Sequence, residues 1–239
     1  MRKIAVFSDV HANLPALEAV LDDISQRGIQ EIYCLGDLVD FAPWGNEVIE
    51  IIKSRGIPCL LGNHDERVAF DYQVMPLPHH DAIETGHRRA AIAHSKERIS
   101  PSNKQWLATL PKQISFTHEG YNVLLVHGST RSNEEYIYEN HAEEDVESMF
   151  REAKADTIIM GHTHLSYHRI TRTGFHAINC GAVGRSKEAD RLASYAVISI
   201  SAQGPTAAIV KVPYDRHRVA DAIYNSEIPN FYGDFLLGK

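Results

Sequence analysis

The chain has 239 residues, 44% of them hydrophobic and 23% charged, which is the composition of a globular protein with a substantial core. Its formal net charge of −7 argues against a broad basic surface for a nucleic-acid backbone. No apolar stretch approaches the length of a membrane span, and the first apolar run is too short for a signal sequence. The three cysteines are widely spaced and form no CxxC pair, so we expect a reduced, cytoplasmic protein.

Short apolar runs of strand length recur along the chain, and most are continuously apolar, as in strands buried on both faces. They lie at 4–7, 32–35, 57–61, 123–126, 157–160 and 195–200. Helical spacing at 14–24 and 48–52 separates the first three runs, and this β-α-β-α-β order predicts a parallel sheet with helices on its faces. Turn signals at 173–174 and 203–205 in the later, strand-rich part predict a second, more antiparallel sheet.

Residues 66 to about 112 differ from the rest of the chain. They contain Pro76 and Pro78, a helical pattern from Ala82 to Ile99, and a second helix start at 100–102. We interpret this segment as a helical insertion within one domain that spans 1–239. It either covers a site, with one of His79, His80, His87 and His94 reaching it, or packs on the outside, and the sequence favours neither.

Metal-ligand residues follow five of the apolar runs directly. The carboxyl ends of parallel strands meet at one edge of a sheet, so we expect these side chains to converge there. A glycine adjoins four of the five groups and lets the backbone turn sharply. A solvated turn explains any one group, but five in this order are hard to attribute to chance. The residues are Asp9 and His11, Asp37 and Asp40, Asn63 and His64, His127, and His162 and His164.

The motifs DxH at 9–11, GDxVD at 36–40, GNHD at 62–65, HG at 127–128 and GHTH at 161–164 resemble the calcineurin-like metallophosphoesterase family. The likeness is greatest to the small bacterial and archaeal phosphodiesterases and covers essentially the whole chain. Further matches are SDVHANLPAL at 8–17, VDFAPWGNEVIE at 39–50 and ASYAVI at 193–198. The resemblance implies an α/β fold, a four-layer αββα sandwich of two mixed sheets flanked by helices, with a helical insertion.

The resemblance also implies a ligand set for two divalent metal ions. Asp9, His11 and His164 would bind one ion. Asn63, His127 and His162 would bind the other, and Asp37 would bridge the two. Imidazole and carboxylate ligands suit manganese, which we expect first, and also iron, zinc, cobalt or nickel. Two such ions and two carboxylates leave a local positive charge that attracts a phosphate anion.

The implied reaction is metal-dependent hydrolysis of a small phosphodiester or phosphomonoester, possibly of a nucleotide, by in-line attack of a metal-bridging hydroxide. His64 would act as the acid or transition-state stabiliser, oriented by Asp40. A carboxylate partner favours the charged imidazolium that an acid requires. Asp40 could instead serve a turn or a helix cap, and Asp65 is interpreted as structural.

Three further positions bear on substrate. Phe41 stands where the Ser/Thr protein phosphatases and the ApaH-type tetraphosphatases usually have arginine, which argues against both classes. Asn13 would touch substrate or a metal-bound water, or else cap the helix that begins near Pro15. Arg131 would meet a phosphate oxygen, or else form a surface salt bridge.

Two alternatives keep the same fold. A non-catalytic protein-binding scaffold is disfavoured because no motif is eroded, and a nuclease is disfavoured by the acidic balance. The expected partner is a small phosphoester substrate, with no membrane and no nucleic acid. The sequence leaves open the substrate, the preference for diester or monoester, and the oligomeric state.

Overall fold

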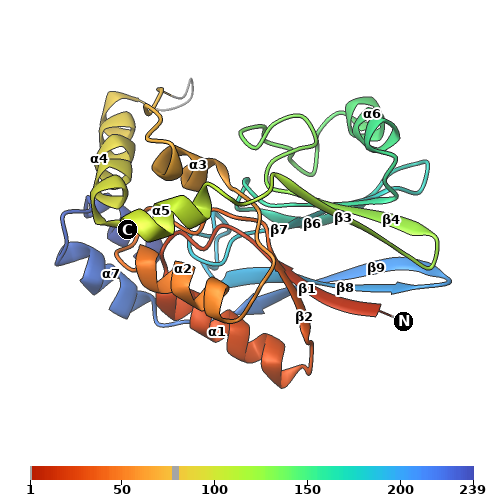
Figure 1. Cartoon of the computed structure of the whole chain (residues 1–239), viewed down its shortest axis with the longest axis horizontal. Coiled ribbons are helices and arrows are strands. Elements are labelled where there is room, and N and C mark those ends of the chain that lie inside the picture. The colour runs from red at the N-terminus through yellow and green to blue at the C-terminus, as the bar shows by residue number, and fades with distance from the viewer. Residues whose placement is uncertain (1, 77–80) are drawn as a thin grey trace.

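The computed structural model describes residues 2–76 and 81–239, which form two β-sheets packed face to face (Figure 1). In the first sheet only β1 and β2 are parallel; in the second, β4, β5 and β7 are parallel and the edge strands β3 and β6 are antiparallel. The first sheet has the order β2 (Glu31–Cys34), β1 (Arg2–Phe7), β8 (Ala193–Ser201), β9 (Gly204–Val212). The second has the order β3 (Gln113–His118), β4 (Tyr121–Val126), β5 (Thr157–Met160), β7 (His176–Cys180), β6 (Ser166–Ile170).

The inner strands β1, β4, β5, β7 and β8 are largely buried on both faces, which explains the continuously apolar runs. In β1, Ile4 and Val6 face the second sheet, whereas Ala5 and Phe7 pack with the helices outside. Those helices are α1 (Leu14–Gln26) and α2 (Gly45–Ser54), while α6 (Glu143–Ala153) covers the outer face of the second sheet (Figure 1). The predicted sandwich of two mixed sheets flanked by helices is confirmed.

Two details of the strand prediction are wrong. The second sheet is not the more antiparallel one, because the late strands β8 and β9 join β1 in the first sheet. The run at 57–61 makes only an isolated parallel bridge between Cys34 and Cys59. Pro58 accepts a hydrogen bond from Cys34 through its carbonyl but has no N–H to donate, so the ladder beside β2 stays short.

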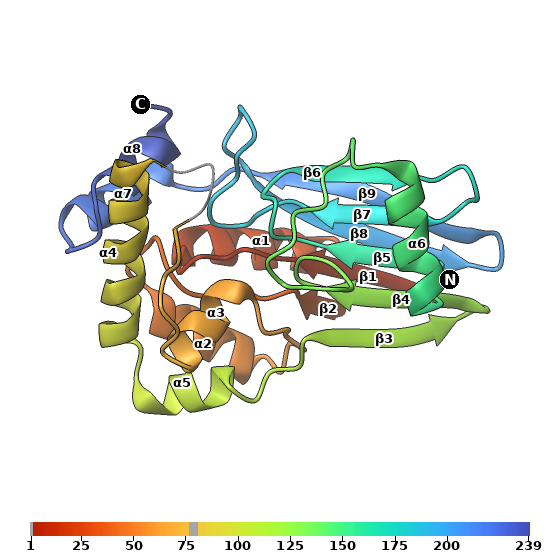
Figure 2. The same cartoon turned by 90° about the horizontal axis from the view of Figure 1, so that it is seen from above.

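Helices gather at one end of the sandwich, opposite the N-terminus (Figure 2). The predicted helices at 82–99 and from 100 onward are present and begin at side-chain caps from Asp81 and Ser100. Apolar side chains of α4, α7 and α8 pack with Phe41 and Ala42 in one cluster. The elements at this end are α3 (Asn63–Ala69), α4 (Ala82–Arg98), α5 (Pro101–Leu107), α7 (Arg216–Tyr224) and α8 (Phe231–Leu237).

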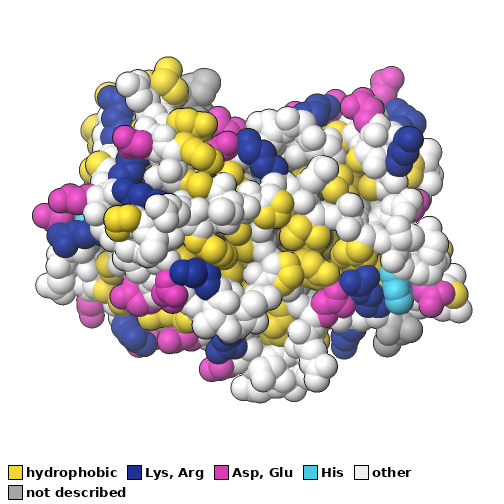
Figure 3. All heavy atoms as spheres, in the orientation of Figure 1, with side chains coloured by type: hydrophobic (Ala, Val, Ile, Leu, Met, Phe, Trp, Pro, Cys, Tyr) yellow, Lys and Arg dark blue, Asp and Glu magenta, His cyan; other side chains and the backbone are white. Residues whose placement is uncertain are grey.

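The surface carries both signs of charge. On the face drawn in Figure 3, acidic and basic side chains are interspersed and hydrophobic side chains gather near its middle. This face therefore shows no single-sign field of the kind that binds a nucleic-acid backbone. Within the described ranges, no helix combines the length and apolar character that crossing a bilayer requires.

Gly86 offers a test of the α4 helix. It is exposed inside the helix, and a Cβ added there would meet nothing within 4 Å. Gly86→Ala should raise the free energy of unfolding by about 1 kcal/mol and the melting temperature by about 2–4 °C, because alanine loses less conformational entropy. Thermal unfolding followed by circular dichroism measures this, and a lowered melting temperature would contradict the helix.

Candidate metal centre

The motif loops are tied to one another through their backbones. The Asp9 N–H donates to the Gly36 carbonyl (3.0 Å) and the His11 N–H to the Asp37 carbonyl (2.9 Å). On the second sheet, the Gly161 N–H donates to the His127 carbonyl (2.8 Å). These bonds fix the loops of each sheet relative to one another, and the side chains of the site extend from these loops.

The loops hold their residues in an unusual backbone conformation. Non-glycine residues rarely adopt positive φ, and such residues cluster at functional sites. In the described ranges, half of the twelve non-glycine residues with positive φ are predicted site residues. They are Asp9, His11, Asp37, Asp40, His162 and His164, with φ between 48° and 73°.

Two glycines let the strand ends approach more closely than a side chain would allow. A Cβ at Gly62 would lie 2.2 Å from the backbone nitrogen and Oδ1 of Asp37. A Cβ at Gly161 would lie 2.2 Å from Ser8 Oγ and 2.7 Å from Asp9 Oδ2. The glycines of GNHD and GHTH are thus needed for close packing beside the two carboxylates.

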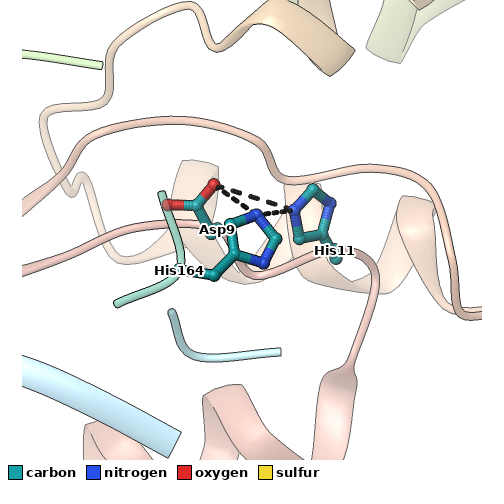
Figure 4. Close-up of side chains that lie close together, drawn as sticks. All are labelled: Asp9, His11 and His164. Carbon is teal, nitrogen blue, oxygen red and sulfur yellow. Dashed lines mark hydrogen bonds and ion pairs between the residues drawn. The ribbon is translucent and has the colours of Figure 1, made fainter. Parts of the chain in front are cut away.

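The first side-chain cluster comprises Asp9, His11 and His164, all buried (Figure 4). His11 Nδ1 lies 3.0 Å from the Val39 carbonyl and His164 Nδ1 lies 2.7 Å from the Arg185 carbonyl, so both Nδ1 atoms carry the proton. Their Nε2 atoms then face each other as acceptors at 3.2 Å. Asp9 Oδ1 lies 3.2 Å from His164 Nε2 and 3.7 Å from His11 Nε2, without a hydrogen-bond donor among the described residues.

The second cluster comprises Asp37, His127 and His162, again buried. His127 Nδ1 lies 2.9 Å from the Leu35 carbonyl, which leaves Nε2 to point inward. That nitrogen lies 3.3 Å from Asp37 Oδ2 and 3.1 Å from Asn63 Oδ1.

Asn63 turns its amide oxygen, not its nitrogen, toward these acceptors. The opposite orientation would satisfy more hydrogen bonds, since the nitrogen would donate to Asp37, His127 and His162 at 3.1–3.2 Å and the oxygen would accept from Arg67. A proton on His127 Nε2 or a cation among these atoms would favour the oxygen there. Either orientation keeps the Asn63 amide within reach of the second cluster.

Asp37 lies between the two clusters. Its Oδ1 accepts a hydrogen bond from the His64 N–H at 2.8 Å. Its Oδ2 lies 3.3 Å from His127 Nε2 and 3.8 Å from His11 Nε2, one ring of each cluster. This is the position that a bridging ligand requires.

The electrostatics of the metal-free site reflect its burial. Burial opposes ionisation of Asp9, but His164 and His11 hold the pKa of that carboxyl well below its usual range, and the histidines beside Asp37 do the same there. Burial lowers the pKa of His162 and His164 to about 3, so both rings are neutral. His127 is the exception, because Asp37 and Asp9 outweigh burial and raise its pKa to about 9.

The donor set fits two divalent ions. Each cluster brings a carboxylate oxygen and two imidazole nitrogens within 4.8 Å of one another, and Asp9 Oδ1 has no hydrogen-bond donor among the described residues, a costly arrangement unless a cation lies among them. Carboxylate, imidazole and amide oxygen are ligands that manganese, iron, zinc, cobalt and nickel accept. In the described ranges these are the two Asp/His groups with metal-binding spacing.

His64 lines a cavity of about 320 Å³ next to both clusters, together with His162 and His164. Its Nδ1 lies 2.5 Å from Asp40 Oδ2, so the predicted pair is present. The expected charge on His64 differs, because burial lowers its pKa more than Asp37 and Asp40 raise it. Asp65 accepts hydrogen bonds from Leu38 N at 2.8 Å and Gly62 N at 3.2 Å, as its structural interpretation requires.

The cavity also answers the question left open about the segment 66–112. Glu84 and Arg88 of α4 line it, so this helix contributes directly to the site. His87 stacks on Phe231 (4.9 Å) and His94 lies 3.7 Å from Glu227, and neither lines the cavity. His79 and His80 lie outside the described residues.

The two predicted substrate-binding residues have other partners. Asn13 caps α1 by accepting from Ala16 N (3.2 Å), and its amide donates to the Gly184 carbonyl (2.9 Å). Arg131 is not brought to the cavity. Its guanidinium is held by Glu135 and Asp145, and it lines a different hollow of about 620 Å³ against β3 and β4. Of the two roles predicted for Arg131, a phosphate contact or a surface salt bridge, the structure shows the salt bridge.

Sequence reasoning missed three cations in the cavity wall: Arg88, Arg185 and Lys187. Arg185 and Lys187 lie in the loop between β7 and β8, and Arg88 lies in α4, none of them within a motif. The signal available was that NCGAVGRSK at 179–187 runs from a strand end into a glycine-containing loop, as the metal motifs do.

Comparisons with known proteins agree with this geometry. Residues 2–203 match the model of the calcineurin-like phosphoesterase superfamily domain. The uncharacterized protein MJ0912 of Methanocaldococcus jannaschii is 30% identical over 99% of this chain and 98% of its own. The metallophosphoesterase from Sphaerobacter thermophilus is 26% identical (TM-score 0.78), and hypothetical protein PH1004 from Pyrococcus horikoshii OT3 is 21% identical (TM-score 0.83). Each covers 99% of this chain and 98% of its own.

Metal content tests the assignment of ligands. The manganese-loaded protein should hold two ions per chain, one for each cluster. His164→Ala should lose the ion of the first cluster and His162→Ala that of the second, while Asp37→Ala weakens both. The exposed His217 gives a matched control, and His217→Ala should keep both ions. Elemental analysis after gel filtration measures this, and two tightly held ions in Asp37→Ala would contradict the bridging position.

Proposed function

The chain belongs to the calcineurin-like phosphoesterase superfamily, and we propose that it is a two-metal-dependent phosphoesterase that hydrolyses a small phosphodiester or phosphomonoester. The observation that carries the proposal is the position of Asp37 Oδ2 between His127 and His11. One carboxylate oxygen can then serve two adjacent ions, and paired ions suit phosphoester hydrolysis.

The two buried Asp/His clusters support the following assignment of ligands. Asp9, His11 and His164 would hold one ion, Asn63, His127 and His162 would hold the other, and Asp37 would serve both. When bound, the ions activate a water molecule and neutralise charge on the phosphoryl oxygens. The backbone carbonyls of Val39, Leu35 and Arg185 orient three of the rings, which keeps the ligand nitrogens aimed at the ions.

His64 is the group we assign to the leaving oxygen. Its Nδ1 is engaged by Asp40, so its Nε2 is the nitrogen available in the cavity. The ring is neutral in the free protein because burial dominates. A phosphoester bound beside it adds negative charge, which favours the imidazolium and allows Nε2 to donate a proton. Asp40 is then a positioning residue that fixes the ring and supports its positive charge.

The cavity fits a small substrate. Its volume of about 320 Å³ lies at the low end of ligand sites. Phe41 packs at 4.7 Å from His11 and 4.9 Å from His64, where the protein phosphatases usually carry an arginine, so the phosphate-gripping group of those enzymes is replaced by an apolar ring. We propose manganese as the working metal, with iron, zinc, cobalt or nickel as substitutes.

Hydrolysis of bis(p-nitrophenyl) phosphate with added Mn²⁺ tests the function. Asp37→Ala should abolish turnover because both ions lose a ligand. His64→Ala should lower kcat by about 10²–10⁴-fold with both ions retained, because proton transfer is lost. Asp40→Asn should lower it by about 10–100-fold. His217→Ala should keep full activity. An undiminished rate in Asp37→Ala would sink the proposal.

A further inference from the structure

We propose that the cavity beside the metal centre contains a second phosphate-binding subsite built from Arg185, Arg88 and Lys187. The substrate is therefore a phosphoester that carries a second phosphate. The identity of the substrate rests on the proposed hydrolysis, but the subsite is argued from residues that are not metal ligands and can be tested by binding alone.

Arg185 is the centre of the subsite. Its guanidinium lies over the rings of Phe235 (4.5 Å), Phe41 (4.9 Å) and Tyr232 (5.4 Å). Its Nε is buried without a hydrogen-bond partner, and no carboxylate of the described residues hydrogen-bonds the group. Rings hold the cation in place and leave its donors unused, and burial lowers its pKa. A guanidinium in this state lacks an anion.

Two more cations reach the same cavity from different elements. Arg88 of α4 is 6% exposed, and its Nη1 donates to the Met75 carbonyl (2.7 Å), an uncharged partner. Lys187 lies with its Nζ 5.6 Å from the Tyr136 ring centroid. The Lys187 side chain is exposed, but desolvation near the cavity wall and then the charge of Arg185 lower its pKa to about 8, so the amine is charged at neutral pH. No ion pair forms at either group within the described ranges.

Other arginines of the chain show what the usual arrangement is. Arg67, also 6% exposed, pairs with Glu134, and Arg169 pairs with Glu143. Arg131 is held by two carboxylates. Buried or partly buried cations are normally paired, because an unpaired one is costly. Arg88 and Arg185 depart from this rule, and both line the cavity that His162 and His164 also line.

The charges in the wall indicate how much anion the cavity receives. Asp9 and Asp37 would cancel half of the charge of two divalent ions, and a phosphodiester together with the attacking hydroxide would offset the remaining two charges. Arg88, Arg185 and Lys187 are opposed in the wall by one carboxylate, that of Glu84. Two positive charges are left, and a phosphate monoester near neutral pH carries about −1.5 to −2.

The rest of the wall accounts for the body of the substrate. Phe231 and Phe235 of α8 and Phe41 present apolar rings in the same wall as the cations, and Phe41 also packs against His64. A molecule that combines a flat or apolar group with two phosphates would contact both the rings and the charges of this wall. A nucleoside 3′,5′-bisphosphate derivative, with its base beside a sugar that carries both phosphates, offers these groups.

A matched pair of substrates tests the subsite. The p-nitrophenyl ester of thymidine 5′-phosphate and the same ester with an added 3′-phosphate differ only in the second anion. The wild-type protein should prefer the 3′-phosphorylated ester by about 10–100-fold in kcat/KM, as charge-assisted contacts of this kind provide. Arg185→Gln should reduce this ratio to about unity, and Arg88→Gln and Lys187→Gln should each reduce it in part. The ratio is taken within each variant, so a general loss of activity cancels.

Arg191→Gln is the control. Arg191 lies over the same Phe235 ring (4.1 Å) but donates to the Ser186 carbonyl and does not line the cavity. The preference should be unchanged in this variant. A wild-type protein without preference, or an unchanged ratio in Arg185→Gln, would overturn the subsite.

A binding measurement separates this inference from the hydrolysis. Calorimetric titration of EDTA-treated protein with thymidine 5′-phosphate and with thymidine needs no turnover. The phosphate should raise the affinity by at least about tenfold, and Arg185→Gln should remove that difference. Equal affinities would overturn the subsite even in an active enzyme. A selective protein that hydrolyses neither ester would retain the subsite and refute the proposed function.

Discussion

Three hydrogen bonds from imidazole Nδ1 to backbone carbonyls organise everything around the metal centre. They fix the orientation of the rings of His11, His127 and His164 and aim the Nε2 of each ring inward. The accepting carbonyls belong to Val39, Leu35 and Arg185, which lie on loops from both sheets. The order of the strands therefore decides where the ligand nitrogens point. A ligand set of this kind is a property of the whole fold, because no single loop could hold it.

The mixed topology of the two sheets also decides where residues of the site lie. Because β8 pairs with β1, the loop after β7 must cross from the second sheet to the first at their common end. That crossing places Gly184 and Arg185 against the loop after β1, where Gly184 N donates to the Asp9 carbonyl at 2.9 Å. The same loop then delivers Arg185 and Lys187 to the cavity. Ligand orientation and the supply of positive charge are thus consequences of one chain crossing.

Much of the fold can be predicted from the sequence, and the strands that cannot be predicted have a physical reason. The runs ending at Phe7, Cys34, Val126 and Met160 are apolar on both faces, so strand length and burial could be inferred together. The run at 57–61 has the same composition, but Pro58 and the edge position limit it to a bridge. The edge strand β3 alternates between exposed and half-buried residues, so it lacks a continuous apolar signal.

The residues of the site also divide into those that a sequence pattern predicts and those that only the fold brings together. The ligand residues are adjacent to strand ends and share a pattern, so the pairing of Asp9 with His11 and of Asn63 with His64 carries local information. Arg88, Arg185 and Lys187 share no pattern, and what brings them together is the packing of α4 and α8 against the loop after β7. Arg131 is the opposite case. It is close to His127 in the sequence and was predicted to bind substrate, but it does not line the cavity.

The left-handed backbone of six site residues restricts how these positions can evolve. They are Asp9, His11, Asp37, Asp40, His162 and His164. Each such conformation costs of order 1–3 kcal/mol for a residue with a side chain, and β-branched residues tolerate it least. In a related protein that had lost the reaction, selection would no longer keep the metal ligands. The left-handed backbone conformation would still restrict which residues can replace them. The replacements at these six positions would be drawn toward glycine, asparagine and aspartate, while valine and isoleucine would be excluded. The loops would then keep a record of the lost metal centre in a sequence that no longer binds one.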